Sequence, residues 1–120
     1  MQNTYRKEYG KDGEDTACAF LEENGFEIIG RNYHAGKIGE LDIIARRENL
    51  VVFAEVKARR SDAFGGGIYS ITQNKKKTLR RCAEHFLVNN PSLNTKQITF
   101  RFDLVLIENN SVEWIGDIVR

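Results

Sequence analysis

Two short runs rich in β-branched and apolar residues, 39–47 and 50–57, are separated only by Glu48-Asn49. A two-residue connection that contains Asn favours a tight β-hairpin turn, so the pattern predicts two antiparallel strands. The turn also fixes which residues face each other, because Arg47 then pairs with Leu50 and the count continues outward along both strands. This register is the strongest constraint that the sequence places on the fold.

The predicted register places four charged side chains on one face of the hairpin. Asp42 lies directly across from Glu55, and directly opposed residues point to the same side of a sheet. Two residues further out, Glu40 lies across from Lys57 on the same side. The other face is apolar and is expected to belong to the core. It carries Leu41, Ile43, Ala45, Val52, Ala54 and Val56.

The two opposed carboxylates need a compensating charge. Their Cβ atoms would lie roughly 4.5 to 5.5 Å apart, a distance at which like charges destabilise a sheet. A divalent cation that takes oxygen ligands from Asp42 and Glu55 offsets this repulsion, and Mg²⁺ is typically bound by one or two carboxylates together with substrate phosphate. Lys57 would then lie beside whatever the metal holds. The residues alone therefore predict a metal site with an adjacent ammonium group.

Length and composition predict one ordinary globular domain. A chain of 120 residues suffices for a single core, so we expect 1–120 to form one domain. No apolar run approaches the roughly 20 residues that span a bilayer, and the N-terminal segment lacks the apolar core of a signal peptide. We therefore expect a cytoplasmic protein without a membrane partner. Cys18 and Cys82 occupy apolar helix positions and are expected to be buried free thiols.

The distribution of charge is more informative than its sum. The net charge of +1 taken alone argues against a nucleic-acid-binding protein. Residues 31–81, however, contain twelve Lys and Arg against five Asp and Glu, whereas the flanking segments contain six against twelve. The basic charge is concentrated in the segment that holds the hairpin, as expected if this segment faces a polyanion. Our candidate phosphate-binding residues are Arg31, Lys37, Arg59, Arg60, Lys75, Lys76 and Arg80.

A helix is predicted before the hairpin, over about 5–24, closed by Gly25 as a C-terminal cap. Its apolar stripe is formed by Ala17, Cys18 and Leu21. Glu14 belongs to the same stripe, because it lies three and four residues before the first two of them. An acid on the core-facing side of a helix is unusual unless it is paired or bound to a metal.

A second helix is predicted from Thr72, a favourable N-cap, to about residue 89, before Pro91. Its first turns carry Lys75, Lys76 and Lys77, which oppose the helix dipole and repel one another. Contacts with phosphate would explain these lysines, and a solvated face is the alternative.

The remaining segments predict strands. Residues 26–33 and 97–107 have strand patterns, and 112–118 is a last edge strand. We expect Arg101 and Asp103 to pair with each other or with the active-site network. Phe100, Phe102 and Trp114 belong either to the core or to an interface. His34 is expected to be a surface histidine, since no acidic partner is evident.

An aspartate on one strand followed by Glu-x-Lys on the next resembles the PD-(D/E)xK nuclease superfamily. The element order α-β-β-β-α-β-β likewise resembles restriction-endonuclease-like folds, which are α/β domains with a mixed β-sheet flanked by helices. More closely, the chain is similar to the bacterial YraN family of small uncharacterised proteins. The matching segments are Gly13-Glu14-Asp15 with Ala17 and Leu21, Arg31-Asn32-Tyr33, 39–45, 53–59, Phe64-Gly65, Lys75 and Arg101-Phe102-Asp103.

The YraN family is in turn similar to archaeal Holliday-junction resolvases, which bind Mg²⁺ through a helical glutamate, an aspartate and a Glu-x-Lys pair. The matching catalytic positions here are Glu14, Asp42, Glu55 and Lys57. The resemblance implies a Mg²⁺- or Mn²⁺-dependent endonuclease that acts on DNA, in particular on branched or structured DNA in repair or recombination. It implies Asp42 and Glu55 as metal ligands and Glu14 as an outer ligand or a partner for a second ion. A two-fold homodimer is expected by analogy.

Departures from the family pattern are minor. His34 stands where the family often has Arg, and Gly66-Gly67 replace a segment that often contains Pro. Two other interpretations stay open. One is a non-catalytic nucleic-acid-binding accessory protein on the same fold, which the complete set of four acid and lysine positions argues against. The other is a purely structural protein with solvated charges.

Overall fold

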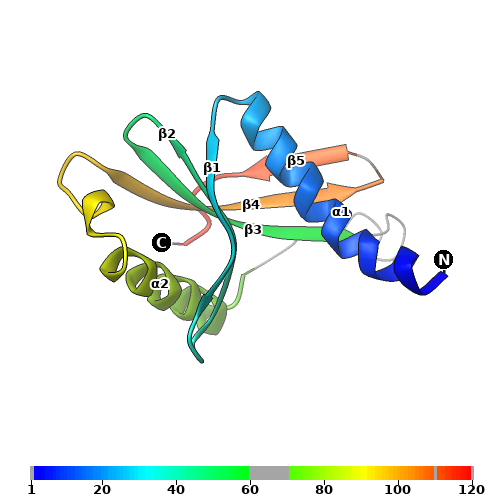
Figure 1. The fold of residues 1–120 in the computed structure, drawn as a ribbon, viewed down its shortest axis with the longest axis horizontal. Helices are drawn as coiled ribbons and strands as arrows, with labels where there is room; N and C mark the ends of the chain where they lie inside the picture. Colours follow the sequence, from blue (N-terminus) through cyan, green and yellow to red (C-terminus); the bar gives the residue numbers. More distant parts are fainter. Residues whose placement is uncertain (1, 60–70, 110, 120) are drawn as a thin grey trace.

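The computed structural model describes residues 2–59, 71–109 and 111–119. Figure 1 shows their arrangement, in the predicted order α-β-β-β-α-β-β with one added 3₁₀ turn. The elements are α1 (Gln2–Glu23), β1 (Glu27–Ala35), β2 (Gly39–Arg47), β3 (Leu50–Arg59), α2 (Gln73–Val88), η2 (Pro91–Leu93), β4 (Thr99–Glu108) and β5 (Ser111–Ile115).

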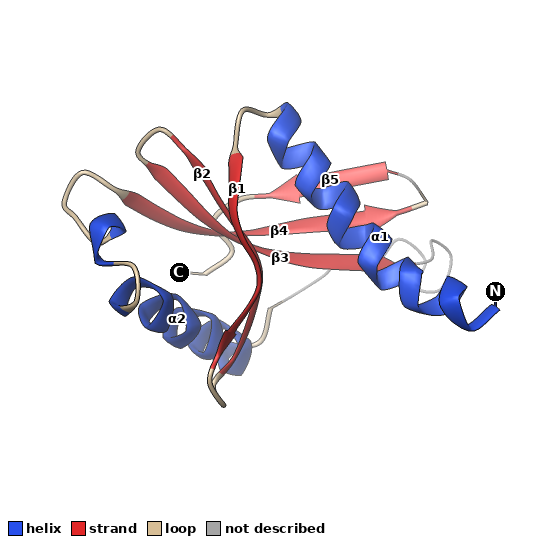
Figure 2. Cartoon of the chain, viewed as in Figure 1, coloured by secondary structure: helices blue, strands red, loops and turns tan. Residues whose placement is uncertain are grey.

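The strands form one five-stranded mixed sheet in the order β1-β2-β3-β4-β5. Neighbours are antiparallel except β3 and β4, which run parallel. A parallel pair needs a crossover connection, and α2 lies in that connection. The fold class predicted from the sequence, an α/β domain with a mixed sheet flanked by helices, is confirmed (Figure 2).

The sheet is covered on both faces, α1 packing on one and α2 on the other. The sequence predicted an apolar core face opposite a charged one. That is wrong for the central strands, because Ile44 and Phe53, on the side assigned to the acids, are buried under α2. The helix of a parallel crossover covers this second face. Leu41 also packs in the α2 cluster, apart from Ile43, with which it was grouped. Cys18 and Cys82 are buried free thiols, as predicted.

Both predicted helix boundaries have the expected local chemistry. Gly25 has a φ of 87°, and the N–H groups of Gly25 and Phe26 donate to the carbonyls of Glu22 and Leu21, each at 3.0 Å. This pair of bonds is the Schellman arrangement that a C-terminal glycine permits. At the start of α2 the Thr72 hydroxyl accepts the N–H of Lys75 at 3.1 Å. None of the helices in the described residues has the length and apolar content needed to cross a bilayer.

The carboxylate of Asp103 ties β4 to β5 and to the C-terminal segment. Asp103 has no exposed surface. It accepts Arg101 Nε and Nη2 at 2.9 and 2.7 Å, Trp114 Nε1 at 2.7 Å and the N–H of Asp117 at 2.9 Å. Trp114 also packs edge-to-face on Phe26. Arg101 and Asp103 therefore pair with each other, and Trp114 belongs to the core.

Gly13 lies where α1 crosses β3 and allows the two elements to approach closely. A Cβ at this position would lie 2.8 Å from the Cβ of Ala58. In an isolated helix Gly→Ala gains about 1 kcal/mol, but an overpacked contact costs typically about 1 to 3 kcal/mol. We expect Gly13→Ala to lower the free energy of unfolding, measured by urea denaturation. Ala58→Gly in the same chain should restore most of the loss, and a stabilising Gly13→Ala would contradict this packing.

Candidate functional site

The hairpin of β2 and β3 has the predicted register, but only near its turn. Paired residues run outward from the turn and end at Ile43 and Ala54. The next pair would be Asp42 with Glu55, and the described ladder does not include it. The prediction that these two acids face each other in a continuous ladder is therefore wrong.

Where the backbone pairing of β2 with β3 ends, the side chain of Asp42 provides a hydrogen-bond acceptor for β3. Its Oδ2 accepts the N–H of Val56 at 2.9 Å. In a continued ladder this N–H would have bonded to the backbone of β2, where Leu41 is the partner on the same register. Beyond this point β2 stays paired with β1, and β3 stays paired with β4 (Figure 1). The two halves of the sheet consequently separate.

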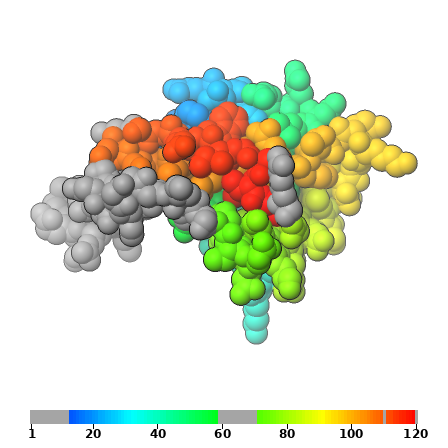
Figure 3. Space-filling model, turned by 180° about the vertical axis from the view of Figure 1, so that it is seen from behind, coloured from blue at the N-terminus to red at the C-terminus, as the bar shows by residue number. Residues whose placement is uncertain are grey.

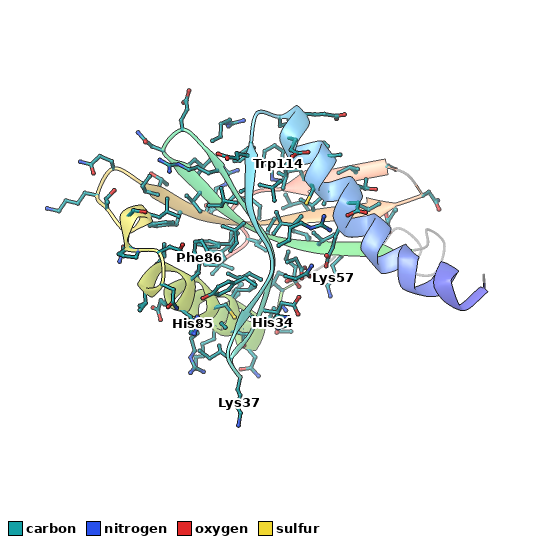
Figure 4. The ribbon with its side chains drawn as sticks, in the orientation of Figure 1. His34, Lys37, Lys57, His85, Phe86 and Trp114 are labelled. Atoms are coloured by element: carbon teal, nitrogen blue, oxygen red, sulfur yellow. The ribbon has the colours of Figure 1, made fainter. Side chains whose placement is uncertain are left out.

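A cavity of about 440 Å³ lies at this separation, and four elements line it. It brings together the four residues that the sequence predicted as catalytic, Glu14 from α1, Asp42 from β2, and Glu55 and Lys57 from β3. Lys75 from α2 lines the same cavity. Figure 4 shows Lys57 on β3 between α1 and the β1–β2 hairpin.

Glu14 lies on the apolar stripe of α1, as the spacing predicted, and its side chain lines the cavity. The close approach at Gly13 and Ala58 holds this turn of the helix against β3. Arg31 Nη2 lies 2.8 Å from Asp15 Oδ1 and 3.6 Å from Glu14 Oε1. Arg31, a candidate phosphate ligand, is thus engaged with the acids of α1, and the hydrogen bond with Asp15 raises its pKa.

Lys75 likewise lies on the inward side of α2 and lines the cavity. A Cβ on Gly39 would lie 2.8 Å from Thr78 Cγ2, so α2 rests directly against the start of β2. Lys75 precedes Thr78 by three residues and the buried Leu79 by four, which places it on the inward side of the helix. Its Nζ lies 3.4 Å from Glu55 Oε2. The spacing to Leu79 was present in the sequence and would have identified this inward orientation.

Glu55 is a buried carboxylate between two ammonium groups. Its side chain is 5% exposed, whereas those of Lys57 and Lys75 are 43% and 38% exposed. Lys57 Nζ lies 3.9 Å from the same Oε2 atom that Lys75 approaches. A buried charge requires compensation. These two lysines supply it for Glu55.

Asp42 lies in a more negative environment. Burial raises the pKa of Asp42 to about 6, although the hydrogen bond from Val56 opposes that shift. The neighbouring carboxylates of Glu55, Glu14 and Glu40 act in the same direction as burial and contribute to this value. A raised pKa means that the site disfavours the negative charge on Asp42 and would favour an added cation.

The donor set fits a divalent cation that takes only two ligands from the protein. In the part of the chain that the structure describes, no three His, Cys, Asp or Glu side chains are grouped closely enough to hold a metal ion. Mg²⁺ commonly uses one or two carboxylates and completes its shell with water and phosphate oxygens. Asp42 and Glu55 on one cavity meet that requirement, and Glu14 lines the same cavity.

The β1–β2 hairpin carries two further predicted residues. His34 Nδ1 lies 4.0 Å from Glu40 Oε1, so the expectation that it lacks an acidic partner is wrong. The two residues are directly opposed across β1 and β2. The side chain of His34 is 73% exposed, in agreement with a surface position. Lys37 lies at the tip of the hairpin and points away from the body of the protein (Figure 4). In Figure 3 this tip projects beyond α2.

The other basic candidates lie away from the acidic cavity or beyond the described side chains. Arg59 ends β3, and its side chain and Arg60 lie outside the described residues. Lys76 is partly buried on α2. Arg80 lines a separate cavity of about 190 Å³ with Phe53, Phe100 and Phe102. The latter two rings pack on Phe53, so they contribute to the core.

The fold and the site define a small mixed α/β protein whose central hairpin opens onto a cavity lined with acids and lysines. Residues 13–107 match the Uncharacterised protein family UPF0102, and the chain belongs to this family. A UPF0102 protein of Caldicellulosiruptor saccharolyticus is 41% identical over 113 residues, which are 94% of this chain and 92% of that protein. One from Neisseria gonorrhoeae is 41% identical over 110 residues, covering 91% and 92%. One from Chloroherpeton thalassium is 40% identical over 99 residues, covering 82% and 74%.

The raised pKa of Asp42 predicts how stability depends on pH in metal-free buffer. The carboxyl titrates at its ordinary value of 3.8 when unfolded and at about 6 when folded. Between these values the folded protein binds more protons, so its stability falls as pH rises. Asp42→Asn keeps an acceptor for the Val56 N–H and carries no charge. We expect its advantage in free energy of unfolding to grow from near zero at about pH 4 to on the order of 2 kcal/mol at about pH 7.

Asp42→Ala is the matched control for the hydrogen bond. It removes the charge and also the acceptor, and an unpaired buried N–H costs about 1 to 3 kcal/mol. Urea denaturation of the three proteins in a chelating buffer at several pH values separates the two effects. A difference between wild type and Asp42→Asn that does not change with pH would contradict the assignment of the shift to Asp42.

Proposed function

We propose that this protein is a Mg²⁺-dependent endonuclease that hydrolyses phosphodiester bonds in DNA, with branched or otherwise structured DNA as its substrate class. The observation that carries the proposal is the convergence of Asp42, Glu55 and Lys57 on one cavity where two strands separate. Two acids can hold a divalent cation, and an ammonium group can stabilise charge that develops on phosphate, so these residue types suit metal-assisted phosphoryl hydrolysis. The resemblance to PD-(D/E)xK nucleases supports the same assignment.

Each residue of the cavity has a distinct role in this proposal. Asp42 and Glu55 would hold Mg²⁺ or Mn²⁺, which when bound supplies the Lewis acid of the reaction. Lys57, partly exposed on the cavity wall, would stabilise the charge that develops on the phosphate or orient the attacking water. Glu14, held by Arg31, would act from an outer position and bias the cavity toward cations.

The basic residues around the cavity would hold the nucleic-acid backbone. Contacts of Lys and Arg with phosphate position a protein on DNA without reading its sequence. Lys37 at the projecting hairpin tip and the lysines of the first turn of α2 provide such contacts. Arg59 and Arg60 follow the Glu-x-Lys motif after one residue, Ala58. The homodimer expected from the resemblance would place two such cavities on one branched substrate.

One observation favours a second candidate, a nucleic-acid-binding protein without turnover. Lys57 and Lys75 already compensate Glu55, so the fold does not need a metal for that carboxylate. Such a protein would keep the basic surface and lose metal binding. Metal binding therefore discriminates the two candidates before any cleavage is measured.

Calorimetric titration with Mn²⁺ tests the metal site. We expect saturable binding to the wild-type protein and at least about tenfold weaker binding to Asp42→Asn, because one of the two proposed carboxylate ligands is lost. Asp15→Asn is a matched control, since Asp15 is an exposed acid next to Glu14 that pairs with Arg31 and does not line the cavity. Equal affinity of wild type and Asp42→Asn for Mn²⁺ would contradict the proposal that the metal binds at this site.

Incubation with supercoiled, single-stranded and four-way-junction DNA in Mg²⁺ or Mn²⁺ tests turnover. Lys57→Ala should lower the cleavage rate by about 100-fold or more, the typical effect of removing one group that stabilises a transition state. Cleavage that survives this change would point to another site or to a contaminant. DNA retention that weakens steeply with salt, without cutting, would instead favour the binding protein.

A further inference from the structure

Two ammonium groups approach one carboxylate oxygen in the cavity. Lys57 Nζ lies 3.9 Å and Lys75 Nζ lies 3.4 Å from Glu55 Oε2. Lys57 lies on the same strand as Glu55, two positions further along. Lys75 comes from α2, far away in the sequence, and makes the closer contact. The proposed hydrolysis assigns no role to this contact.

The contact of Lys75 can be broken without unfolding α2. Its backbone is fixed by the N-cap bond to Thr72 and by the packing of Thr78 on Gly39. Its side chain is 38% exposed and ends in a flexible four-carbon stem. The ammonium group can therefore leave Glu55 by rotating toward solvent, while the helix stays in place.

A divalent cation and an ammonium group do not share one carboxylate oxygen favourably, because the two positive charges repel at such short range. A buried carboxylate without any counter-ion is also unfavourable. Glu55, at 5% exposure, is therefore expected to keep both lysines beside it until a metal replaces one of them. Lys75 lies close enough to Glu55 to act as its counter-ion when the metal is absent.

We propose that Lys75 is an exchangeable counter-ion for Glu55, displaced by a divalent cation and thereby released to bind phosphate at the mouth of the same cavity. The inference rests on the proposed metal site. It adds an order of events, in which the metal binds first and the released lysine then binds phosphate. The metal-free cavity keeps a lysine bound to an acid. The metal-loaded cavity presents that lysine to a phosphodiester, so the basic surface becomes complete only when the metal is present.

Metal affinity tests the exchange without measuring catalysis. Lys75→Met removes the competing charge and keeps the length of the side chain. We expect it to bind Mn²⁺ about fivefold more tightly than wild type, or tighter, as expected when a partly exposed ion pair no longer has to be broken. Lys77→Met is the matched control, because it removes the same charge from an exposed position on the same helix turn. Its affinity should stay within about twofold of wild type.

The reactivity of the lysine amines tests the release directly in the wild-type protein. Brief acetylation with an N-hydroxysuccinimide ester, resolved by residue with mass spectrometry, should modify Lys75 slowly in chelator and several times faster in saturating Mg²⁺. Lys76 and Lys77 serve as internal controls and should react equally in both conditions. This measurement needs no variant, so a folding defect of Lys75→Met would not prevent the test.

The outcomes separate this inference from the proposed function. Both changes are required, so an unchanged Mn²⁺ affinity in Lys75→Met or an unchanged reactivity of Lys75 overturns the exchange. Metal binding that is lost in Asp42→Asn would still support the metal site in that case. Absence of binding to both wild type and Lys75→Met removes the metal site and the exchange together. Binding by Lys75→Met alone would support the exchange in its strongest form.

Discussion

The hydrogen bond from the Val56 N–H to Asp42 is the interaction on which the rest of the structure depends. Paired strands can separate only if the freed backbone groups find other partners, because a buried N–H without an acceptor is costly. Asp42 supplies that acceptor with a side chain. The strands β1 and β2 then continue toward α2, and β3 continues with β4 toward α1 (Figure 2). Asp42 therefore has two roles. Its carboxylate allows the strands to separate, and it lines the resulting cavity as a candidate metal ligand.

Each helix contributes to the cavity one charged residue from its buried stripe. Glu14 and Lys75 occupy positions at which helix spacing alone would place apolar side chains. Gly13 and Gly39 make this placement possible, because each allows a helix to approach a strand closely at the edge of the cavity. Charged residues at core positions reduce stability unless they are paired. Their presence on both helices, facing one opening, is the arrangement that makes this cavity a candidate functional site.

Local chemistry made much of this structure predictable. The Glu48-Asn49 turn gave the register near the turn, Gly25 and Thr72 gave helix boundaries, and helix spacing gave the inward orientation of Glu14. Features that depend on distant residues were missed. Counting outward from a turn assumes an unbroken ladder, so it could not reveal that pairing stops at Ile43. The burial of the second sheet face depends on the parallel pairing of β3 with β4, whose partners are about fifty residues apart in the sequence.

The balance of charge in the cavity is the physical basis of the proposed exchange between a metal and a lysine. The repulsion expected between Asp42 and Glu55 has two solutions, and the structure contains one of them, since Lys57 and Lys75 compensate Glu55. Asp42 keeps a raised pKa because it is buried and because the carboxylates of Glu55, Glu14 and Glu40 lie near it. One divalent ion between the two carboxylates would satisfy Asp42 and replace one ammonium group at Glu55. Lys57 lies on the same strand as Glu55, two positions further along, so it stays beside the carboxylate when a metal binds. Lys75, on a separate element, is the lysine expected to leave.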